Sequence, residues 1–438
     1  MKTQPYTLTA SDFVPGADAQ PVIQQTLDLF RQVVIEKIPY PLQLGKAVVV
    51  HSGTRLTVHP ETVLTDREGC GGCLLRNEHI VCGLEAPEPE DVPRDENILV
   101  EGGVWQASYP GAARSYRNDD HPVMRICSER NTALGVLSFC NAEHITVRNV
   151  KIAGARVYGV FVCRCRDFLV EKITFERQGT DGVHINGPSS CGTIRQIRGK
   201  CGDDIFALNA WDWHESALCF GAISDILVED VIADFDEARL LPGTKKYASG
   251  EVRDCSITNC TFRRIEGLYT IKMYQQPYYL NSVRGLDDRS LTPGLMKNIT
   301  FEDFRIAGDT NEAMSECRLS AFWEIGADIE NAVWKNIAVD ADREAFQRQG
   351  MTLASVGPKS STYTRGDPDP ETWIELFEPD LICRGNNLRF ENVTFAGEPC
   401  RDEETILKAV HLTVNPDYPR TKPKGGTGYG VLTGVTIR

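Results

Sequence analysis

The most regular feature of the chain is a short pattern of apolar and polar positions that recurs along it. Apolar residues occupy positions 1, 3, 6 and 8 of each copy, and polar residues, often Asn, Asp or Lys, stand between them. HITVRNVKI and DFLVEKITF are the first two clear copies, and they place Ile145 and Phe168 at the same position, 23 residues apart. Further copies, one of them degenerate, begin at Ile194, Ile226, Cys255, Ile299, Ala332, Leu388 and Leu432.

Each copy predicts two short strands around a bend. Alternation within each half turns every second side chain to one side of a strand, and Asn or Asp tolerates the backbone of a tight bend. The first copies follow one another at about the length of one solenoid coil, and the wider gaps between later copies indicate loops inserted between coils. An antiparallel sandwich is the alternative, but the tight Asn-Gly or Asp-Gly hairpins that it favours are scarce here. We therefore predict an all-β protein, a single right-handed parallel β-helix.

The two ends of the repeat region differ from the coils. PVIQQTLDLFRQVV carries an apolar stripe that includes Val22, Leu27 and Phe30, which predicts a helix. Terminal repeats of a solenoid need a cover, so we expect residues 1–40 to form an N-terminal cap of the same domain. Residues 41–438 are then the β-helix with inserted loops, among them the EAFQRQGM and GDPDPETW segments.

Composition and charge narrow the possible partners. The chain has 438 residues, of which 41% are hydrophobic, and a formal net charge of −14. An acidic surface repels nucleic acid and anionic lipid, so we expect neither as a partner. No apolar stretch approaches the ~18 residues of a membrane span. MKTQPYTLTASDFVPG lacks the apolar core of a signal peptide, which leads us to expect a cytoplasmic protein.

The cysteines predict no metal or cofactor site. The chain has 15 of them, scattered along its length, as is typical of reduced, buried thiols. Cys70 and Cys73 form a CxxC pair with Cys82 nearby, but a zinc site needs a second pair, and none follows at the usual spacing. We expect these residues to be structural.

Two segments that align without gaps carry the candidate chemistry. GTDGVHIN spans residues 179–186 and GDDIFALN spans residues 202–209, an offset of one coil. Stacked coils would place Asp181 beside Asp204, with Asp203 adjacent, because neighbouring strands lie about 4.8 Å apart. Carboxyl groups that lie this near to one another shift one another's pKa, as a pair of general acid and general base requires. Turn capping and calcium binding are the alternatives.

These two motifs resemble glycoside hydrolase family 28, the polygalacturonases, within the pectin-lyase-like β-helix superfamily. That family has Asn-Thr-Asp-Gly, then Gly-Asp-Asp about one coil later, and its opening is similar to ASDFVPGADAQPVIQQTLD and to Gly102-Gly-Val-Trp105 here. The resemblance implies that Asp203 is the general acid. It also implies that Asp181 and Asp204 hold and activate a water, with inversion of the anomeric centre.

The family's two later motifs, Gly-His-Gly and Arg-Ile-Lys, are altered in this chain. The first is replaced by a coil containing Glu237 and Arg239, and the second reads Thr270-Ile-Lys272. The resemblance implies that Lys272 binds substrate, with Arg239 near the place of the absent histidine. The arginine that helps to bind a uronate carboxylate is missing, which leaves a uronate and a neutral sugar both open.

Five further residues are candidates for substrate binding. His184 follows Asp181 in the same predicted strand, and Trp211, Asp212 and Trp213 follow the second motif. Tyr274 stands close to Lys272 in the sequence. Aromatic faces suit sugar rings, and Asp or His accepts hydroxyl hydrogen bonds. The alternatives are a structural histidine and packing of the tryptophans in the core.

The sequence therefore predicts an enzyme, a glycoside hydrolase that cleaves O-glycosidic bonds of an oligosaccharide without a cofactor. Long inserted loops would close one end of a cleft, which favours exo action. A polysaccharide lyase that uses Lys272 and calcium, or an intramolecular sugar transferase, is an alternative on the same scaffold. A non-catalytic carbohydrate-binding protein is the third possibility, although it has no need of stacked aspartates.

Overall fold

The computed structural model describes residues 2–67, 70–80, 92–107, 135–155, 157–212, 218–247, 249–274, 294–307, 321–358, 382–411 and 428–438. The chain forms two compact units. Unit 1 comprises Met1–Ala207, His214–Cys219 and Ile226–Asp234, and unit 2 comprises Leu208–Trp213, Phe220–Asp225 and Phe235–Arg438.

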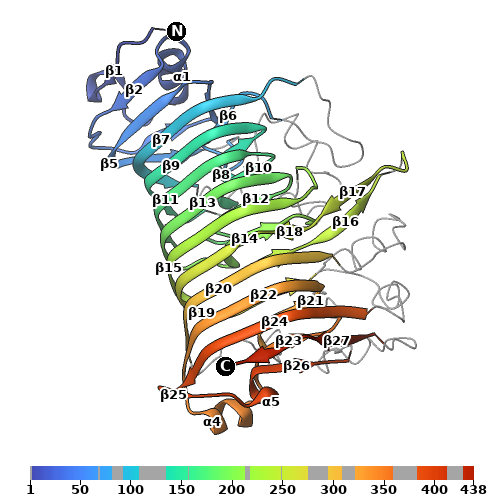
Figure 1. The fold of residues 1–438 in the computed structure, drawn as a ribbon. Coiled ribbons are helices and arrows are strands. Elements are labelled where there is room, and N and C mark those ends of the chain that lie inside the picture. The colour runs from blue at the N-terminus through green and yellow to red at the C-terminus, as the bar shows by residue number, and fades with distance from the viewer. Residues whose placement is uncertain are drawn as a thin grey trace, which may run out of the picture. The chain divides into compact units, whose positions relative to one another are not determined.

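Unit 1 is built from two columns of parallel strands. One column contains β5 (Arg55–Asp66), β7 (Asp95–Gln106), β9 (Ala142–Ala153), β11 (Arg166–Glu176) and β13 (Ser189–Gly199). The other contains β4 (Val48–Val50), β6 (Leu75–Asn77), β8 (Gly135–Cys140), β10 (Tyr158–Cys163) and β12 (Val183–Asn186). Figure 1 shows β7, β9, β11 and β13 side by side in chain order. The strands β1 (Tyr6–Leu8), β2 (Gln32–Ile35) and β3 (Leu42–Leu44) precede the columns, and β14 (Asp204–Asn209) follows β12.

Unit 2 repeats this arrangement. Its long strands are the end of β15 (Ile223–Leu241), β19 (Thr261–Tyr274), β20 (Leu295–Ala307), β22 (Asp328–Asp340) and β24 (Ile382–Phe395). The shorter parallel strands are β18 (Ile257–Thr258), β21 (Ala321–Gly326), β23 (Thr352–Val356), β26 (Leu407–Ala409), β27 (Tyr429–Thr433) and β28 (Thr436–Ile437). A hairpin joins β16 (Gly243–Lys246) to β17 (Val252–Cys255), and β25 (Glu398–Pro399) folds back on β24.

The fold is a right-handed parallel β-helix, as predicted. Nearly all strand pairs of the described residues are parallel, and the antiparallel ones are β16–β17, β24–β25 and a bridge between His411 and Tyr429. An antiparallel sandwich, the alternative that the pattern left open, would instead have mostly antiparallel strand pairs.

The repeat pattern explains the coil geometry. In β9 the four apolar positions of HITVRNVKI are at most 2% exposed: Ile145, Val147, Val150 and Ile152. In β11 the equivalent residues from Phe168 to Phe175 are at most 3% exposed, and Phe168 is in register with Ile145. Asn149 and Lys172 hold the bends between the two halves with φ of 55° and 54°. Each coil therefore adds one apolar layer to a continuous core.

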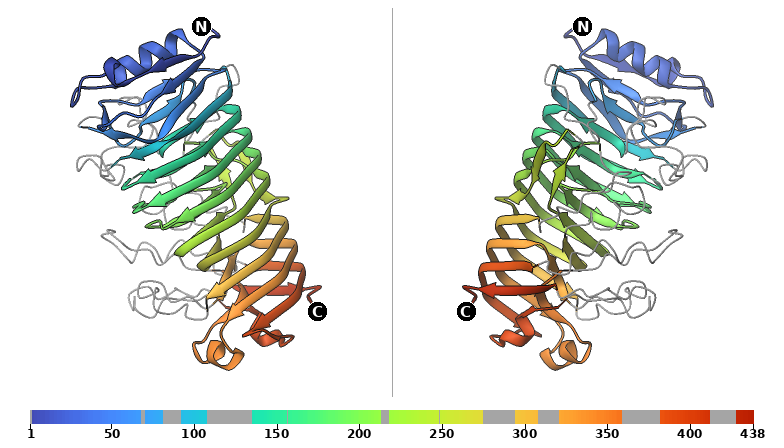
Figure 2. Two further views of the ribbon diagram at one scale, coloured as in Figure 1. Left: turned by 90° about the vertical axis from the view of Figure 1, so that its left-hand side faces the viewer. Right: turned by 90° about the vertical axis from the view of Figure 1, so that its right-hand side faces the viewer.

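The chain begins with a helix and then returns to strands. The predicted helix is present as α1 (Gln20–Leu29), which lies beyond the first strands of unit 1 in both views of Figure 2. Its predicted C-terminal end was wrong, because residues 32–35 form strand β2, paired with β5. Val33, Val34 and Ile35 are β-branched and alternate in burial, which favours a strand. Elsewhere in the described part of the chain the helical elements are short: η1 (Ala10–Asp12), α4 (Arg343–Arg348) and α5 (Glu403–Ile406).

The described residues contain no helix that is long and apolar enough to cross a membrane.

Side chains of α1 bind it to the coils. The Gln24 amide donates to the Val49 carbonyl oxygen (3.0 Å) and accepts from the Val49 amide (2.8 Å). His51 lies between Asp28 of α1 (2.9 Å) and Glu78 (2.7 Å). Because carboxylates only accept hydrogen bonds, both ring nitrogens of His51 must donate. Burial opposes the charge on this ring, but the bonds to Glu78 and Asp28 outweigh it and raise the pKa of His51.

A ladder of asparagines occupies equivalent bends of unit 2. The Asn331 amide donates to the Asn298 side-chain oxygen (3.2 Å), and Asn387 donates to Asn331 (2.7 Å). All three residues have φ between 53° and 56°, in the left-handed region. Asn suits such a column because its amide carries both a donor and an acceptor and because it tolerates this backbone.

We expect Asn331→Ala to lower the free energy of unfolding by about 2–3 kcal/mol. About 1–2 kcal/mol is the cost of the left-handed region for Ala, whose side chain lacks the local hydrogen bonds that let Asn adopt this backbone. The lost hydrogen bonds of the ladder account for the rest. Asn331→Gly keeps the backbone conformation but loses the same bonds, so its loss should be about 1 kcal/mol smaller. Urea denaturation measures both values. Equal losses for the two variants would show that the left-handed backbone contributes nothing.

Candidate functional site

The coil register of unit 1 places the aspartates of the two aligned motifs at equivalent positions. In the second column, Phe161 of β10 pairs with His184 of β12, an offset of one coil. Along the same side, the Gly159 amide donates to the Asp181 carbonyl oxygen (2.9 Å), and the Gly182 amide donates to the Asp204 carbonyl oxygen (2.8 Å). Asp181 and Asp204 thus stand at the same point of successive coils.

The structure brings three carboxylates together, which we call the carboxylate trio: Asp181, Asp203 and Asp204. Each contributes a carboxylate oxygen, and these atoms lie within 4.8 Å of one another. Asp181 is 2% exposed and Asp204 is 0% exposed, whereas Asp203 is partly exposed. Burial and like charge both oppose full ionisation of such a group. The trio can therefore both hold and release protons, and Asp203 is the member with the most access to solvent.

Glycines beside the aspartates permit this close stacking. A β-carbon on Gly182 would lie 2.6 Å from the Ile205 carbonyl oxygen, and one on Gly202 would lie 2.8 Å from the Gly179 carbonyl oxygen. Both distances are shorter than van der Waals contact, so a larger residue would push the coils apart. The glycine that neighbours each aspartate motif therefore has a packing role.

His184 is oriented toward the trio. Its Nδ1 lies 2.5 Å from Asp181 Oδ2, and its ring is 1% exposed and stacked on Tyr158 at 3.8 Å between centroids. Its Nε2 lies 3.2 Å from the Asn186 side-chain nitrogen, which can only donate. Nε2 is therefore the acceptor, and the proton on Nδ1 points to Asp181. The ring is buried and contacts Asp181, and its contact with substrate stays a prediction.

In unit 2 the two cations predicted to bind substrate, Lys272 and Arg239, both lie close to the carboxylate of Glu237. Lys272 Nζ lies 2.5 Å from Glu237 Oε1, and Arg239 Nη2 lies 3.8 Å from the same oxygen. The Tyr269 hydroxyl donates to the second oxygen of Glu237 (3.0 Å). Glu237 stands two residues before Arg239 in the altered motif, but no motif predicts a role for it. Its carboxylate offsets part of the positive charge expected of Lys272 and Arg239.

Trp211 is a core residue. Trp211 is 1% exposed, its ring lies 5.2 Å from that of Phe220, and Gly243 packs against its side chain. Of the two interpretations of Trp211, core packing is the one observed, because a buried indole offers no face to a sugar. Asp212 is also buried, at 2% exposure. Trp213 lies outside the described residues.

Tyr274 is described in its backbone alone, which ends β19 and pairs with Gly326 of β21.

The described cysteines of unit 1 are buried thiols, except Cys191, which is exposed. Cys70 Sγ donates to the Cys73 carbonyl oxygen (3.1 Å), and burial raises the pKa of Cys70 well above its usual range. Cys140, Cys163 and Cys219 lie within 4.8 Å of one another, and burial likewise raises the pKa of Cys163. The structural role of the CxxC pair stays a prediction. Cys82 lies outside the described residues.

Comparisons with known proteins identify the fold class. No protein-family profile matches the sequence, and a search of curated proteins found no match. Among solved structures, a hyperthermoactive exopolygalacturonase from Thermotoga maritima matches with a TM-score of 0.51 and 10% identity, over 100% of this chain and 93% of that one. The N-terminal fragment of bacteriophage Phi29 gene product 12 matches with a TM-score of 0.53 and 11% identity, over 87% of this chain and 60% of that one.

A polygalacturonase from Erwinia carotovora has a TM-score of 0.48 and 11% identity over 100% of this chain and 98% of its own. By fold, the protein is one of the right-handed parallel β-helix proteins. Because an exopolygalacturonase and a phage protein share this fold with the chain, the function has to be argued from the site.

We expect Asp203→Asn to leave the free energy of unfolding unchanged or to raise it by up to about 1 kcal/mol, because it removes one of three like charges. Asn has nearly the same volume, so packing is preserved. Denaturant unfolding of the wild type and the variant measures the difference. A loss above about 2 kcal/mol would instead indicate that Asp203 caps a turn that the fold requires.

Proposed function

We propose that the protein is a glycoside hydrolase that cleaves an O-glycosidic bond of an oligosaccharide with inversion. The observation that carries the proposal is the carboxylate trio, whose oxygens lie within 4.8 Å of one another on consecutive coils. Glycoside hydrolysis requires one carboxyl that gives a proton and another that accepts one. Two buried carboxyls and a partly exposed third, grouped this closely, are costly for stability alone, and such costs are typical of catalytic sites.

Asp203 is the general acid in this proposal. It is the partly exposed member of the trio, and a proton donor has to reach the glycosidic oxygen of a bound sugar. Protonation of that oxygen breaks its bond to the anomeric carbon as the leaving sugar departs. Asp181 and Asp204 hold a water, take its proton and direct its oxygen to the same carbon.

His184 is a positioning residue for Asp181 in this scheme. The proton on its Nδ1 is donated to Asp181 Oδ2, which favours the ionised, proton-accepting form of that carboxyl. Stacking on Tyr158 fixes the ring, and Asn186 fixes the position of its proton. Asp181 is therefore the better base and Asp203 the better acid.

The substrate class follows from the charges of unit 2. Lys272 and Arg239 remain the candidate substrate-binding cations, but Glu237 offsets their charge. This balance favours a neutral or sparsely charged oligosaccharide over a polyanion. Exo action on such a substrate belongs to the proposal as well.

The stereochemical outcome is the sharpest test of the roles. Inverting enzymes usually keep their two carboxyls about 6.5–9.5 Å apart and retaining enzymes about 5–5.5 Å apart. One oxygen of each carboxylate in the trio lies within 4.8 Å of the other two, and inversion in this proposal has the water held by Asp181 and Asp204 together. NMR of the first-formed product should show the inverted anomer. The retained anomer would assign one of these two carboxylates as a covalent nucleophile.

We expect Asp203→Asn to reduce the turnover of a responsive oligosaccharide by about 10²–10⁴-fold, the usual contribution of a general acid. Substrates are identified with a panel of neutral and uronate-containing oligosaccharides in ¹⁸O-labelled water, with products read by mass spectrometry. Hydrolysis adds one labelled oxygen per cleavage, whereas β-elimination adds none and creates an unsaturated product.

Asp303→Asn is the matched control, because Asp303 accepts a hydrogen bond from Asn336 in a bend of unit 2. It should retain full activity. An active Asp203→Asn enzyme would refute the assignment of the acid. Sugar binding without any cleavage across the panel would favour a carbohydrate-binding protein over an enzyme.

For His184→Ala we expect a kcat about 10–100-fold lower, with a small change in KM, because the positioned proton donor to Asp181 is lost. The acidic limb of the pH profile of kcat/KM should move to higher pH, since ionised Asp181 loses a hydrogen bond. His184→Gln, which keeps an N–H donor, should recover part of both effects. A change in stability with an unmoved pH profile would make His184 purely structural.

A further inference from the structure

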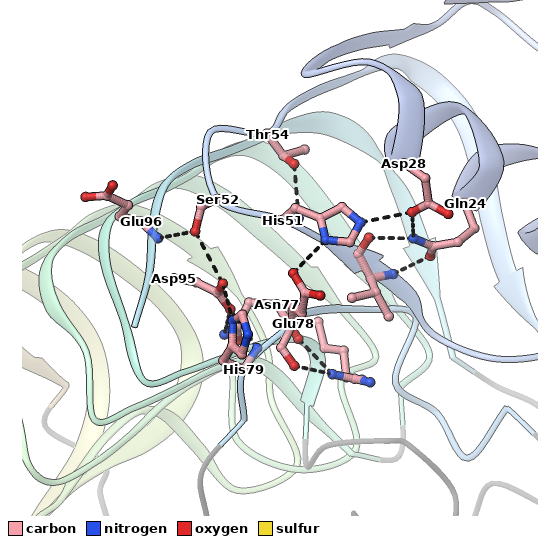
Figure 3. Close-up of polar contacts among 12 residues, drawn as sticks. Gln24, Asp28, His51, Ser52, Thr54, Asn77, Glu78, His79, Asp95 and Glu96 are labelled. Atoms are coloured by element: carbon pink, nitrogen blue, oxygen red, sulfur yellow. Dashed lines mark hydrogen bonds and ion pairs between the residues drawn. The ribbon is translucent and has the colours of Figure 1, made fainter. Parts of the chain in front are cut away.

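A second cluster of ligand-type side chains lies at the junction of β6 and β7 in unit 1. Glu78 and His79 directly follow β6, and Asp95 is the first residue of β7. One ligand atom from each of the three residues lies within 4.8 Å of the other two. Figure 3 shows these side chains converging beside the His51 ring, and none of them belongs to the carboxylate trio. We call them the Glu78 cluster.

Asp95 is held as a fixed, buried carboxylate. It is 0% exposed, and its Oδ2 accepts from the Asn77 side-chain amide (2.7 Å) and from the His79 backbone amide (2.7 Å). Its Oδ1 lies 2.8 Å from His79 Nδ1 and accepts from the Ser52 hydroxyl at 3.3 Å. Hydrogen bonds of this kind orient a carboxylate in the way that outer-shell partners orient metal ligands.

Glu78 is oriented from the other side. Its Oε2 accepts from His51 Nδ1 (2.7 Å), and the second ring nitrogen of His51 donates to Asp28 (2.9 Å). This chain of side chains holds Glu78 near His79 and Asp95, although the Glu78 side chain is 44% exposed. Two carboxylates, one of them fully buried, are thus held close to one imidazole.

We propose that the Glu78 cluster binds a divalent transition-metal ion of the zinc class through His79 Nδ1 and the carboxylates of Asp95 and Glu78. One imidazole and two carboxylates form a nitrogen and oxygen set that suits zinc, with a fourth position for water. Calcium and magnesium prefer oxygen ligands alone, which argues against them. The ion takes the place of the proton shared by His79 and Asp95, and its charge balances the two carboxylates.

The ion would have a structural role. Glu78 and His79 stand at one end of the segment that connects β6 to β7, and Asp95 stands at the other end. A metal that joins Glu78 and His79 to Asp95 cross-links these two parts of the chain, which stabilises the folded state by restricting the unfolded chain. This inference is independent of the proposed function, because it involves no residue of the carboxylate trio.

The test is zinc binding to the full chain after dialysis against EDTA. Isothermal titration with zinc chloride should show about one ion per chain, and the melting temperature should rise with zinc concentration, because a ligand that binds the folded state stabilises it. His79→Ala should weaken zinc binding by more than about 100-fold and should abolish the thermal shift, because outer-shell changes alone cost about 10–100-fold. Glu78→Gln, at a partly exposed site, should weaken binding by at least about tenfold for the same reason.

Two matched controls separate this site from others. His144 Nδ1 lies 2.7 Å from Asp167 in an exposed pair, and no third ligand of the described residues groups with them. His144→Ala should therefore bind zinc like the wild type. Cys163→Ser, which alters the buried cysteine group, should do the same. Unchanged zinc binding in His79→Ala, loss of binding in Cys163→Ser, or no binding by the wild type would each overturn the proposal.

Discussion

The hydrogen-bonded register between successive coils is the constraint on which the rest of the structure depends. Because each strand pairs in parallel with the strand one coil later, a residue meets its equivalent at the spacing of neighbouring strands. A residue at one point of a coil therefore lies beside the residue at the same point of the next coil. Apolar residues form a continuous core in this way, and polar residues are forced into columns.

The columns differ in how well their members tolerate one another. Asn298, Asn331 and Asn387 satisfy one another, because each amide both donates and accepts. Asp181 and Asp204 stand in an equivalent stacked relation but can only accept when ionised. The same register thus stabilises the chain where it stacks asparagine and brings like charges together where it stacks aspartate. This difference is the physical reason to look for chemistry at the carboxylate trio.

Charged side chains elsewhere are matched with partners from other elements. Glu237 accepts from Tyr269 and pairs with Lys272, which lies on another strand, and His51 joins a helix to the coils through Asp28 and Glu78. In both cases a partly buried charge is compensated by residues distant in sequence. Such compensation limits how much a single charged residue reveals about ligands when it is considered alone.

The repeat pattern by itself determined the coil, the bends and the stacking of the two aspartate motifs. These features were predictable because strand periodicity and a constant offset are local properties that the parallel register then propagates. The extent of α1 was less predictable, since pairing with β5 decided that residues 32–35 extend as a strand.

Tertiary structure alone decided the environments of individual side chains. Trp211 became a core residue, His184 became a partner of Asp181, and Glu237 joined Lys272 and Arg239. The Glu78 cluster likewise exists only because β6 and β7 bring its three residues together. Burial and pairing depend on which coils and connections meet in space, and a pattern along one chain does not contain that information.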